Sequence, residues 1–346
     1  MTYSLKPLDQ QVIVITGASS GIGLATVRAA AAKGAKLVLA ARSGDVLSNM
    51  EQEINAAGGE AIHVVADVAR REDVQQIADA AIKRFGGFDT WINLVGLGIF
   101  GRLEDINLKD NRRLFDINFW SVVHGSLIAA KHLKQRGGAI INMGSLASDV
   151  AFPLQGMYAA SKHAVKGFTN ALRVELAAEN APISVTLIKP AGINTPFDHH
   201  AKNYTENEPK IPPPVYDPKE VAYALLHAAT HPRRQIYVGG AAKMMSTLYK
   251  HVPEAVDWFN KKVMTRQQLR NEPPRNPQGA LYQSSNEGNV DGDWPGYVMK
   301  NSFYTRSALS PVVKVSALAV LGVAAFALLG GLDNIKIRFL SASEGE

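Results

Sequence analysis

The 346-residue sequence contains no cysteine. This absence excludes disulfide bonds, thiolate metal sites and a cysteine nucleophile, and it permits a reducing compartment. The sequence also lacks a long basic run with interleaved aromatic residues, which argues against a nucleic-acid partner. Residues 1–10 lack the apolar segment of a secretory signal peptide, so we expect the protein to start in the cytosol.

The composition is that of a globular protein. Hydrophobic residues make up 46% of the chain and charged residues 20%. This balance is sufficient for a large core in one main domain with additions. The net charge of +6 comes from 37 basic and 31 acidic residues spread along the chain. We therefore expect small anionic ligands.

The stretch Thr16–Gly23, with sequence TGASSGIG, lies between an apolar run at 12–15 and a helical pattern at 24–32. A buried strand, a glycine turn and a helix form the first half of a βαβ unit, and the helix N-terminus favours an anion such as a pyrophosphate. Gly17 permits the turn, Gly21 lets the phosphates approach the backbone, and Gly23 lets the helix pack closely on the strand. The alternative is an ordinary strand-to-helix turn.

The second apolar run, residues 36–41, ends in alanine and is followed by Arg42. In dinucleotide-binding folds an acidic residue at this place selects NAD, whereas an arginine accommodates the 2′-phosphate of NADP. We therefore expect NADP as the cofactor, with NAD less favoured. The alternative is a solvated arginine at a strand end.

Apolar runs and helical patterns alternate as far as residue 240. The predicted strands are 12–15, 36–41, 61–65, 90–95, 139–143, 183–188 and 235–238. The predicted helices are 24–32, 47–57, 72–85, 107–135, 155–180 and 217–230. Strict alternation predicts an α/β Rossmann fold, a doubly wound parallel sheet of about seven strands with helices on both faces. Residues 196–216 are polar and proline-rich and are predicted to form a mobile lid.

Three residues near the end of the fifth strand and on the next helix suggest catalysis. Tyr158 and Lys162 are four residues apart and share one helical face. A nearby ammonium favours the phenolate, so we expect it to bring the tyrosine pKa toward the working range. Ser145 follows the strand at the carboxyl edge of the sheet, where its hydroxyl could hold a carbonyl oxygen. The alternative is a packed ring and a solvated charge.

The combination of TGxxxGxG and YxxxK on one predicted Rossmann domain resembles the classical short-chain dehydrogenase/reductase family, over residues 10 to about 240. The resemblance implies a catalytic set of Ser145, Tyr158, Lys162 and Asn118, the last holding a proton-relay water. It implies cofactor contacts at Gly17, Ser19, Ser20, Gly21, Ile22, Gly23, Arg42, Asp67, Val68, Asn93, Tyr158, Lys162, Pro190, Ile193 and Thr195.

Within this set the resemblance gives particular roles to four residues. Arg42 would bind the 2′-phosphate and Asp67 the adenine edge, while the backbone of Ile193 and the side chain of Thr195 would hold the nicotinamide carboxamide. Two departures from the family pattern stand beside the site. The family's NNAG is NLVG at residues 93–96, and the glycine expected after Pro190 is alanine.

The expected reaction is hydride transfer from NADPH to a small carbonyl substrate, or the reverse reaction on an alcohol, with Tyr158 as the proton donor. No metal is expected, and His199 and His200 are interpreted as lid residues. A homo-oligomer is compatible with the resemblance. The alternative function is a membrane-tethered NADP-binding module with a regulatory role, and that reading predicts bound cofactor without turnover.

Beyond the catalytic domain, residues 1–240, the pattern changes. Residues 241–307 are predicted to be a basic helical extension, mainly helical over 243–270, followed by a polar linker. Residues 308–332 include eighteen consecutive uncharged residues and are expected to cross a membrane, leaving a short tail at 333–346. The alternative is a buried or interface helix. We expect a membrane-anchored protein with a cytoplasmic catalytic domain, a lid facing the bilayer and a lipid-like substrate.

Overall fold

The computed structural model describes residues 4–285 and 288–310. Its centre is a seven-stranded parallel sheet in the order β11-β7-β6-β4-β1-β2-β3. The strands are β1 (Val12–Thr16), β2 (Lys36–Ala41), β3 (Ala61–Val65), β4 (Thr90–Asn93), β6 (Gly138–Met143), β7 (Ile183–Pro190) and β11 (Gln235–Val238). The predicted doubly wound sheet is confirmed.

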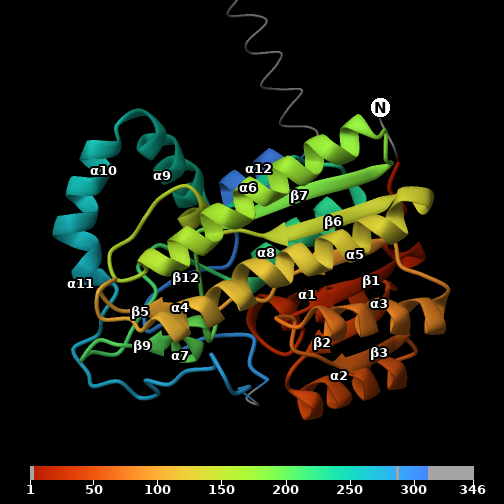
Figure 1. Ribbon diagram of the computed structural model, residues 1–346, viewed down its shortest axis with the longest axis horizontal. Helices are drawn as coiled ribbons and strands as arrows, with labels where there is room; N and C mark the ends of the chain where they lie inside the picture. The colour runs from red at the N-terminus through yellow and green to blue at the C-terminus, as the bar shows by residue number, and fades with distance from the viewer. Residues whose placement is uncertain (1–3, 286–287, 311–346) are drawn as a thin grey trace, which may run out of the picture. The chain divides into compact units, whose positions relative to one another are not determined.

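Helices cover both faces of this sheet. Figure 1 shows α3 (Arg71–Phe85), α5 (Ser121–Arg136) and α6 (Gly156–Ala178) on the near face, while α1 (Gly21–Ala31) and α8 (Pro218–Thr230) pack together on the far face. Helix α2 (Gly44–Ala56) packs on β2 and β3. Because both faces are covered, the central strands can be apolar throughout, and every residue of β1, β4, β6 and β7 is buried.

The long helix predicted at 107–135 is divided in the structure. Helix α4 (Leu108–Phe115) begins after Asn107, whose side chain accepts a hydrogen bond from the Asp110 amide. A π-helical turn, η2 (Asp116–Trp120), then separates α4 from α5. Such turns widen the helix by one residue and are frequent at functional sites. This one contains Asn118.

The helix predicted at 243–270 is also divided. It consists of α9 (Gly240–His251), α10 (Pro253–Phe259), a second π-helical turn η4 (Asn260–Met264) and α11 (Thr265–Gln267). Proline has no backbone N–H and its ring clashes with the preceding turn, so Pro253 ends α9 and begins α10.

The lid predicted at 196–216 contains short ordered elements. Helix α7 (Phe197–His200) is followed by β9 (Lys202–Asn203), which pairs with β5 (Ile99–Phe100). Strand β10 (Val215–Tyr216) lies between β8 (Gly192–Ile193) and β12 (Val298–Met299). The lid is thus attached at both ends. The remaining short helices of the first unit are η1 (Leu8–Gln10) and η3 (Leu146–Ser148).

The boundary expected at residue 240 does not separate two bodies, because residues up to Ser302 belong to one compact unit. A second unit begins at Phe303, and its described part is α12 (Phe303–Leu309). The predicted membrane segment, 308–332, lies outside the described residues except for 308–310, and so does the tail at 333–346. Among the described helices, none combines the length and hydropathy that a bilayer crossing needs.

Candidate active site

The glycine turn between β1 and α1 depends on glycine at three positions. Gly17 and Gly21 have φ values of +73° and +52°, which glycine adopts without strain. A Cβ on Gly23 would lie 1.8 Å from the Gly17 carbonyl oxygen. The tight contact at Gly23 is therefore within the turn itself, and not only with the strand as the sequence suggested. The first turn of α1 opens into a cavity.

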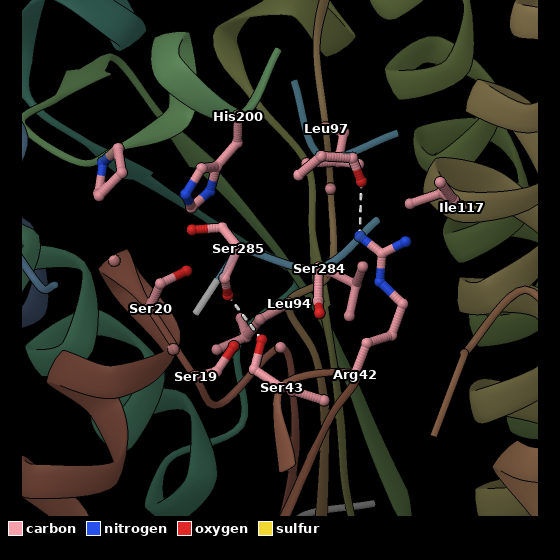
Figure 2. Close-up of a pocket in the computed structure, with 18 of the residues that line it drawn as sticks. Ser19, Ser20, Arg42, Ser43, Leu94, Leu97, Ile117, His200, Ser284 and Ser285 are labelled. Atoms are coloured by element: carbon pink, nitrogen blue, oxygen red, sulfur yellow. Dashed lines mark hydrogen bonds between the residues drawn. The ribbon is translucent and has the colours of Figure 1, made fainter. Parts of the chain in front are cut away.

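That cavity, the cofactor cavity, brings together most of the predicted cofactor residues (Figure 2). Its lining includes the turn at one end, Arg42 and Asp67 at the other, and Thr195 immediately before the lid. From the predicted set it contains Gly17, Ser19, Ser20, Gly21, Ile22, Gly23, Arg42, Asp67, Val68 and Thr195. Ser20 is the N-cap residue of α1, but its hydroxyl makes no capping hydrogen bond. A phosphate-bearing ligand fits these donors.

Asn93 lines neither this cavity nor the second one described below. Its amide lies in a buried polar network, where it accepts from Trp91 Nε1 at 2.8 Å and donates to Asn142 Oδ1 at 2.8 Å. Asn93 is thus outside both cavities, and its predicted cofactor contact stays a prediction. The side chain connects β4 and β6 beneath the site.

Arg42 lies in the cofactor cavity as expected, but it has unexpected partners. Its Nη2 donates to the main-chain carbonyls of Ala280 at 2.6 Å and Gln283 at 3.2 Å. Its Nη1 is buried and has no hydrogen-bond partner among the residues that the structure describes. Burial, more than any neighbouring charge, lowers the pKa of the guanidinium. The sequence did not indicate that residues near 280 reach this position.

Asp67 lines the same end of the cavity and is paired. Although burial opposes ionisation, hydrogen bonds from Arg113 Nη2 at 2.6 Å and from the Ala69 amide hold the pKa of its carboxyl below the ordinary value. Arg113 also donates to the Leu281 carbonyl. The predicted adenine contact therefore has to share this carboxylate with an arginine.

The second cavity, of about 340 Å³, is the substrate cavity, and it contains Ser145, Tyr158 and Lys162. Ser145 follows β6 and caps η3, its Oγ accepting from the Ala147 amide. Lys162 Nζ donates to the Met143 carbonyl at 3.0 Å and lies 5.8 Å from the centre of the Tyr158 ring. Pro190, Ile193 and Thr195 line this cavity too. The predicted catalytic residues are thus close together.

The expected lowering of the Tyr158 pKa is not what the structure shows. Burial raises the pKa of Tyr158 to about 12, and a hydrogen bond with Ser145 opposes this only in part. Burial also lowers the pKa of Lys162 to about 8. Burial is the main cause of both shifts, so the phenol keeps its proton at neutral pH.

Asn118 uses its side chain to shape the loop after β4. Its Oδ1 accepts from the Leu97 amide at 2.8 Å, and its Nδ2 donates to the Leu97 carbonyl at 2.9 Å and to Ser161 Oγ at 3.1 Å. A Cβ on neighbouring Gly96 would lie 3.1 Å from Lys162 Nζ. The side chain of Asn118 therefore fixes the loop that passes over the lysine.

Much of the substrate cavity comes from parts of the chain that the sequence did not place there. Its lining is mainly apolar and includes Phe152, Ile211, Met244, Met245, Phe259 and Met264. Met244, Met245 and Met264 lie in the stretch that the sequence analysis described as a basic helical extension. These apolar residues were the sequence feature that could have indicated a cavity wall there. Phe197 of α7 packs edge-on against Tyr158, with ring centres 5.3 Å apart.

His199 of the lid faces a charged cluster. Ligand atoms of Asp198, His199 and Asp293 lie within 4.8 Å of one another, a spacing that a metal could use. Arg270 and Arg275 already form ion pairs with Asp293, however. A cation site is disfavoured where guanidinium groups neutralise the Asp293 carboxylate. The cluster is therefore a polar contact between the lid and Asp293.

The two cavities share Ile22, Leu94, Gly96, Thr195 and Phe197 and therefore meet. A glycine turn and a Ser–Tyr–Lys group on one Rossmann sheet define a dehydrogenase-type oxidoreductase site. The family model for short chain dehydrogenase matches residues 11–206, and the chain belongs to this family.

Similar proteins agree with this assignment. The uncharacterized oxidoreductase YxnA of Bacillus subtilis is 44% identical over 328 residues, which are 93% of this chain and 91% of that protein. A short-chain dehydrogenase/reductase of Burkholderia phymatum, solved with NAD, has a TM-score of 0.65 at 29% identity and covers 73% of this chain and 97% of its own. An alcohol dehydrogenase of Thermococcus sibiricus, solved with 5-hydroxy-NADP, has a TM-score of 0.58 at 27% identity and covers 66% and 95%.

Proposed function

We propose that this protein is an NADP(H)-dependent oxidoreductase that reduces the carbonyl group of an apolar small molecule, or catalyses the reverse reaction. The observation that carries the proposal is the meeting of the cofactor cavity, which contains the glycine turn, Arg42 and Asp67, with the apolar substrate cavity beside Tyr158. When bound there, the nicotinamide cofactor supplies or accepts the hydride.

The residues around Tyr158 have the protonation states that carbonyl reduction needs. Ser145 Oγ can hold the carbonyl oxygen, and the phenol of Tyr158, with a pKa of about 12, is protonated and able to donate to that oxygen. An alkoxide is more basic than a phenolate, so this transfer is downhill once hydride has arrived. The Lys162 amine, with a pKa of about 8, is largely protonated at neutral pH and would stabilise the resulting phenolate.

The preference for NADP is supported by the end of β2. Ala41 offers no carboxylate to a ribose hydroxyl, and the buried Nη1 of Arg42 has no partner within the described residues. A buried N–H without a partner is costly, and a phosphate oxygen would satisfy it.

An apolar substrate is supported by the cavity wall and by the surface outside it. Met244 and Phe259 line the cavity and are also solvent-exposed, Met244 by 57%. Leu248 of α9 and Trp258 of α10, the latter 63% exposed, are further exposed apolar residues on these two helices. The exposed lysines nearby in sequence are Lys243, Lys250, Lys261 and Lys262. An apolar surface flanked by lysines is typical of helices that lie on anionic membranes.

The test of the reaction is NADPH oxidation by the full-length protein with carbonyl compounds of increasing chain length. We expect turnover to rise with apolar chain length and NADPH to be used in preference to NADH. The regulatory alternative predicts tight NADPH binding with no turnover on any compound. No binding of either cofactor would contradict the proposal.

The proposed contact of α9 and α10 with an anionic membrane has its own test. Trp258→Glu should reduce binding of the full-length protein to phosphatidylserine-containing vesicles and reduce activity on substrates presented in them. Tyr297→Glu is the control, because Tyr297 is 83% exposed but lies outside α9 and α10. Equal sedimentation of the two variants with vesicles would remove α9 and α10 as a membrane contact. The anchor expected at 308–332 would then remain to be tested by deletion.

A further inference from the structure

A segment far from the family-matched region closes the cofactor cavity. We call residues 276–285 and 288–294 the strap. Ala280, Ser284 and Ser285 of the strap line the cofactor cavity together with Arg42 and the glycine turn (Figure 2). The family match ends at residue 206, so the strap lies outside the core that this match covers.

The strap is bonded to the same groups that would receive the cofactor. Arg42 donates to the Ala280 and Gln283 carbonyls, and Ser43 Oγ donates to the Ser285 carbonyl at 2.7 Å. At the opposite end of the cavity, the Gly21 amide donates to the Asn289 carbonyl at 2.8 Å. The strap therefore crosses the cavity from the Arg42 end to the first turn of α1.

Two buried polar atoms in this cavity lack hydrogen-bond partners within the described residues. One is Arg42 Nη1 and the other is Ser285 Oγ. Both can donate, and both belong to residues that line the cofactor cavity. Buried donors are rarely left unpaired, and oxygen atoms of a phosphate-bearing ligand in the cavity would satisfy each of them.

The strap is also joined to the lid. Asp293 forms ion pairs with Arg270 and, at 2.7 Å, with Arg275, and its carboxylate lies 2.9 Å from Nε2 of His199 in α7. The backbone at Gly292 is so close to the lid that a Cβ would lie 2.5 Å from the Thr195 carbonyl oxygen. The Ala280 amide donates to the His200 carbonyl at 2.8 Å. Strap and lid thus form one closure over the cavity.

We propose that the strap is a cofactor clamp. It closes over bound NADP(H), the Ser285 hydroxyl of the strap and Arg42 Nη1 each bind a phosphate oxygen of the cofactor, and Asp293 holds the clamp shut against α7. The proposal rests on the proposed function, because it needs a dinucleotide in the cavity. It assigns control of cofactor release to a segment outside the shared core.

The test is the release of NADPH from the full-length protein, followed by stopped-flow fluorescence after mixing with excess NADP⁺. Asp293→Asn should accelerate release about tenfold, since it removes the charge that three partners share. Asp291→Asn is the matched control, because Asp291 is exposed and two residues away. Release of NADPH from Asp293→Asn at the wild-type rate would contradict the proposal that Asp293 holds the clamp shut.

Ser285→Ala tests the phosphate contact. We expect NADPH affinity to fall about tenfold, as for loss of one hydrogen bond to a charged group. A larger loss for NADPH than for NADH would assign the contact to the 2′-phosphate, and equal losses would assign it to the pyrophosphate. Unchanged affinity for both cofactors would overturn the contact.

A third measurement applies even if these variants fail to fold. Because the chain has no cysteine, Gln283→Cys creates a single labelling site on an exposed strap residue. The emission of an attached environment-sensitive dye should change as NADPH saturates the protein, and a constant emission would overturn the clamp. If the wild-type protein binds no nicotinamide cofactor, the proposed function fails. If it binds normally while all variants behave as wild type, only the clamp fails.

Discussion

The sheet with its helices and the cover over its carboxyl edge are held together in different ways. We define the cover as residues 194–216, 240–285 and 288–294. The sheet is held by continuous parallel ladders with apolar side chains buried on both faces. The cover has two-residue strands, short helices and many contacts from side chains to main-chain carbonyls. The predicted catalytic residues thus lie on the sheet and its helices, whereas the cover lines much of the two cavities and has fewer ladder bonds.

One carboxylate connects the two regions. Asp149, shortly after Ser145, accepts from Lys166 of α6, Lys189 of β7 and Ser246 of α9, all within 2.7 Å. Lys189 is only 1% exposed, so this is a buried ion pair. The wall of the substrate cavity is therefore attached to the end of the sheet through a charge.

The largest expected effect comes from the base of the site. Tyr158→Phe removes the proton donor and retains the ring that packs against Phe197. Turnover should fall by about 10²–10⁴, while NADPH binding should stay within a few-fold of wild type. Steady-state rates check the fall in turnover, and a fluorescence titration of the same preparation checks the NADPH affinity. Near-normal turnover would exclude Tyr158 from proton transfer.

The connection between the two regions should have the next largest effect. Asp149→Asn leaves Lys189 buried without its counter-charge and should cost about 3 kcal/mol in the free energy of unfolding. Urea unfolding measures this, with Asp257→Asn on the exposed side of α10 as the control. A loss below about 0.5 kcal/mol, typical of a surface substitution, would show that the pair does not hold the cover.

The same carboxylate predicts a pH dependence. Despite burial, hydrogen bonds from Lys166, Lys189 and Ser246 lower the pKa of Asp149 to about 2. A carboxyl whose folded-state pKa is below the unfolded value stabilises the fold above about pH 4 and loses that contribution as the pH falls through about 2. The contribution is about 2 kcal/mol, so the stability of wild type and Asp149→Asn should converge in this window. Parallel curves would contradict the assignment.

The smallest expected effect concerns Arg42, which belongs to the sheet but bonds to the cover. Arg42→Ala should weaken NADPH by about tenfold to a hundredfold, as for loss of a charge-assisted contact, and weaken NADH by much less. Titrations with both cofactors measure the difference. Equal losses would mean that Arg42 acts only by holding the strap, and the cofactor preference would then need another cause.

The sheet could be predicted from the sequence because the evidence for each strand lies within a few consecutive residues. Each strand is a short apolar run, and Tyr158 and Lys162 lie on one helix, so spacing alone places them together. The substrate wall and the strap could not be predicted in this way, because Met245 and Ser285 reach the site through contacts between residues far apart in the chain. The predicted lowering of the Tyr158 pKa was also wrong. Burial raises this pKa, and burial depends on what packs around the ring, which a sequence motif does not show.

The way Arg42 and Ser43 recognise the strap has a consequence for sequence variation. Both donate to main-chain carbonyls, of Ala280, Gln283 and Ser285, and every amino acid supplies such a carbonyl. The side chains at residues 280 and 283 can therefore change among relatives without loss of these bonds. An enzyme that shares this closure need not share a recognisable motif there, so the strap is better traced by chain length and by the residues that donate to it.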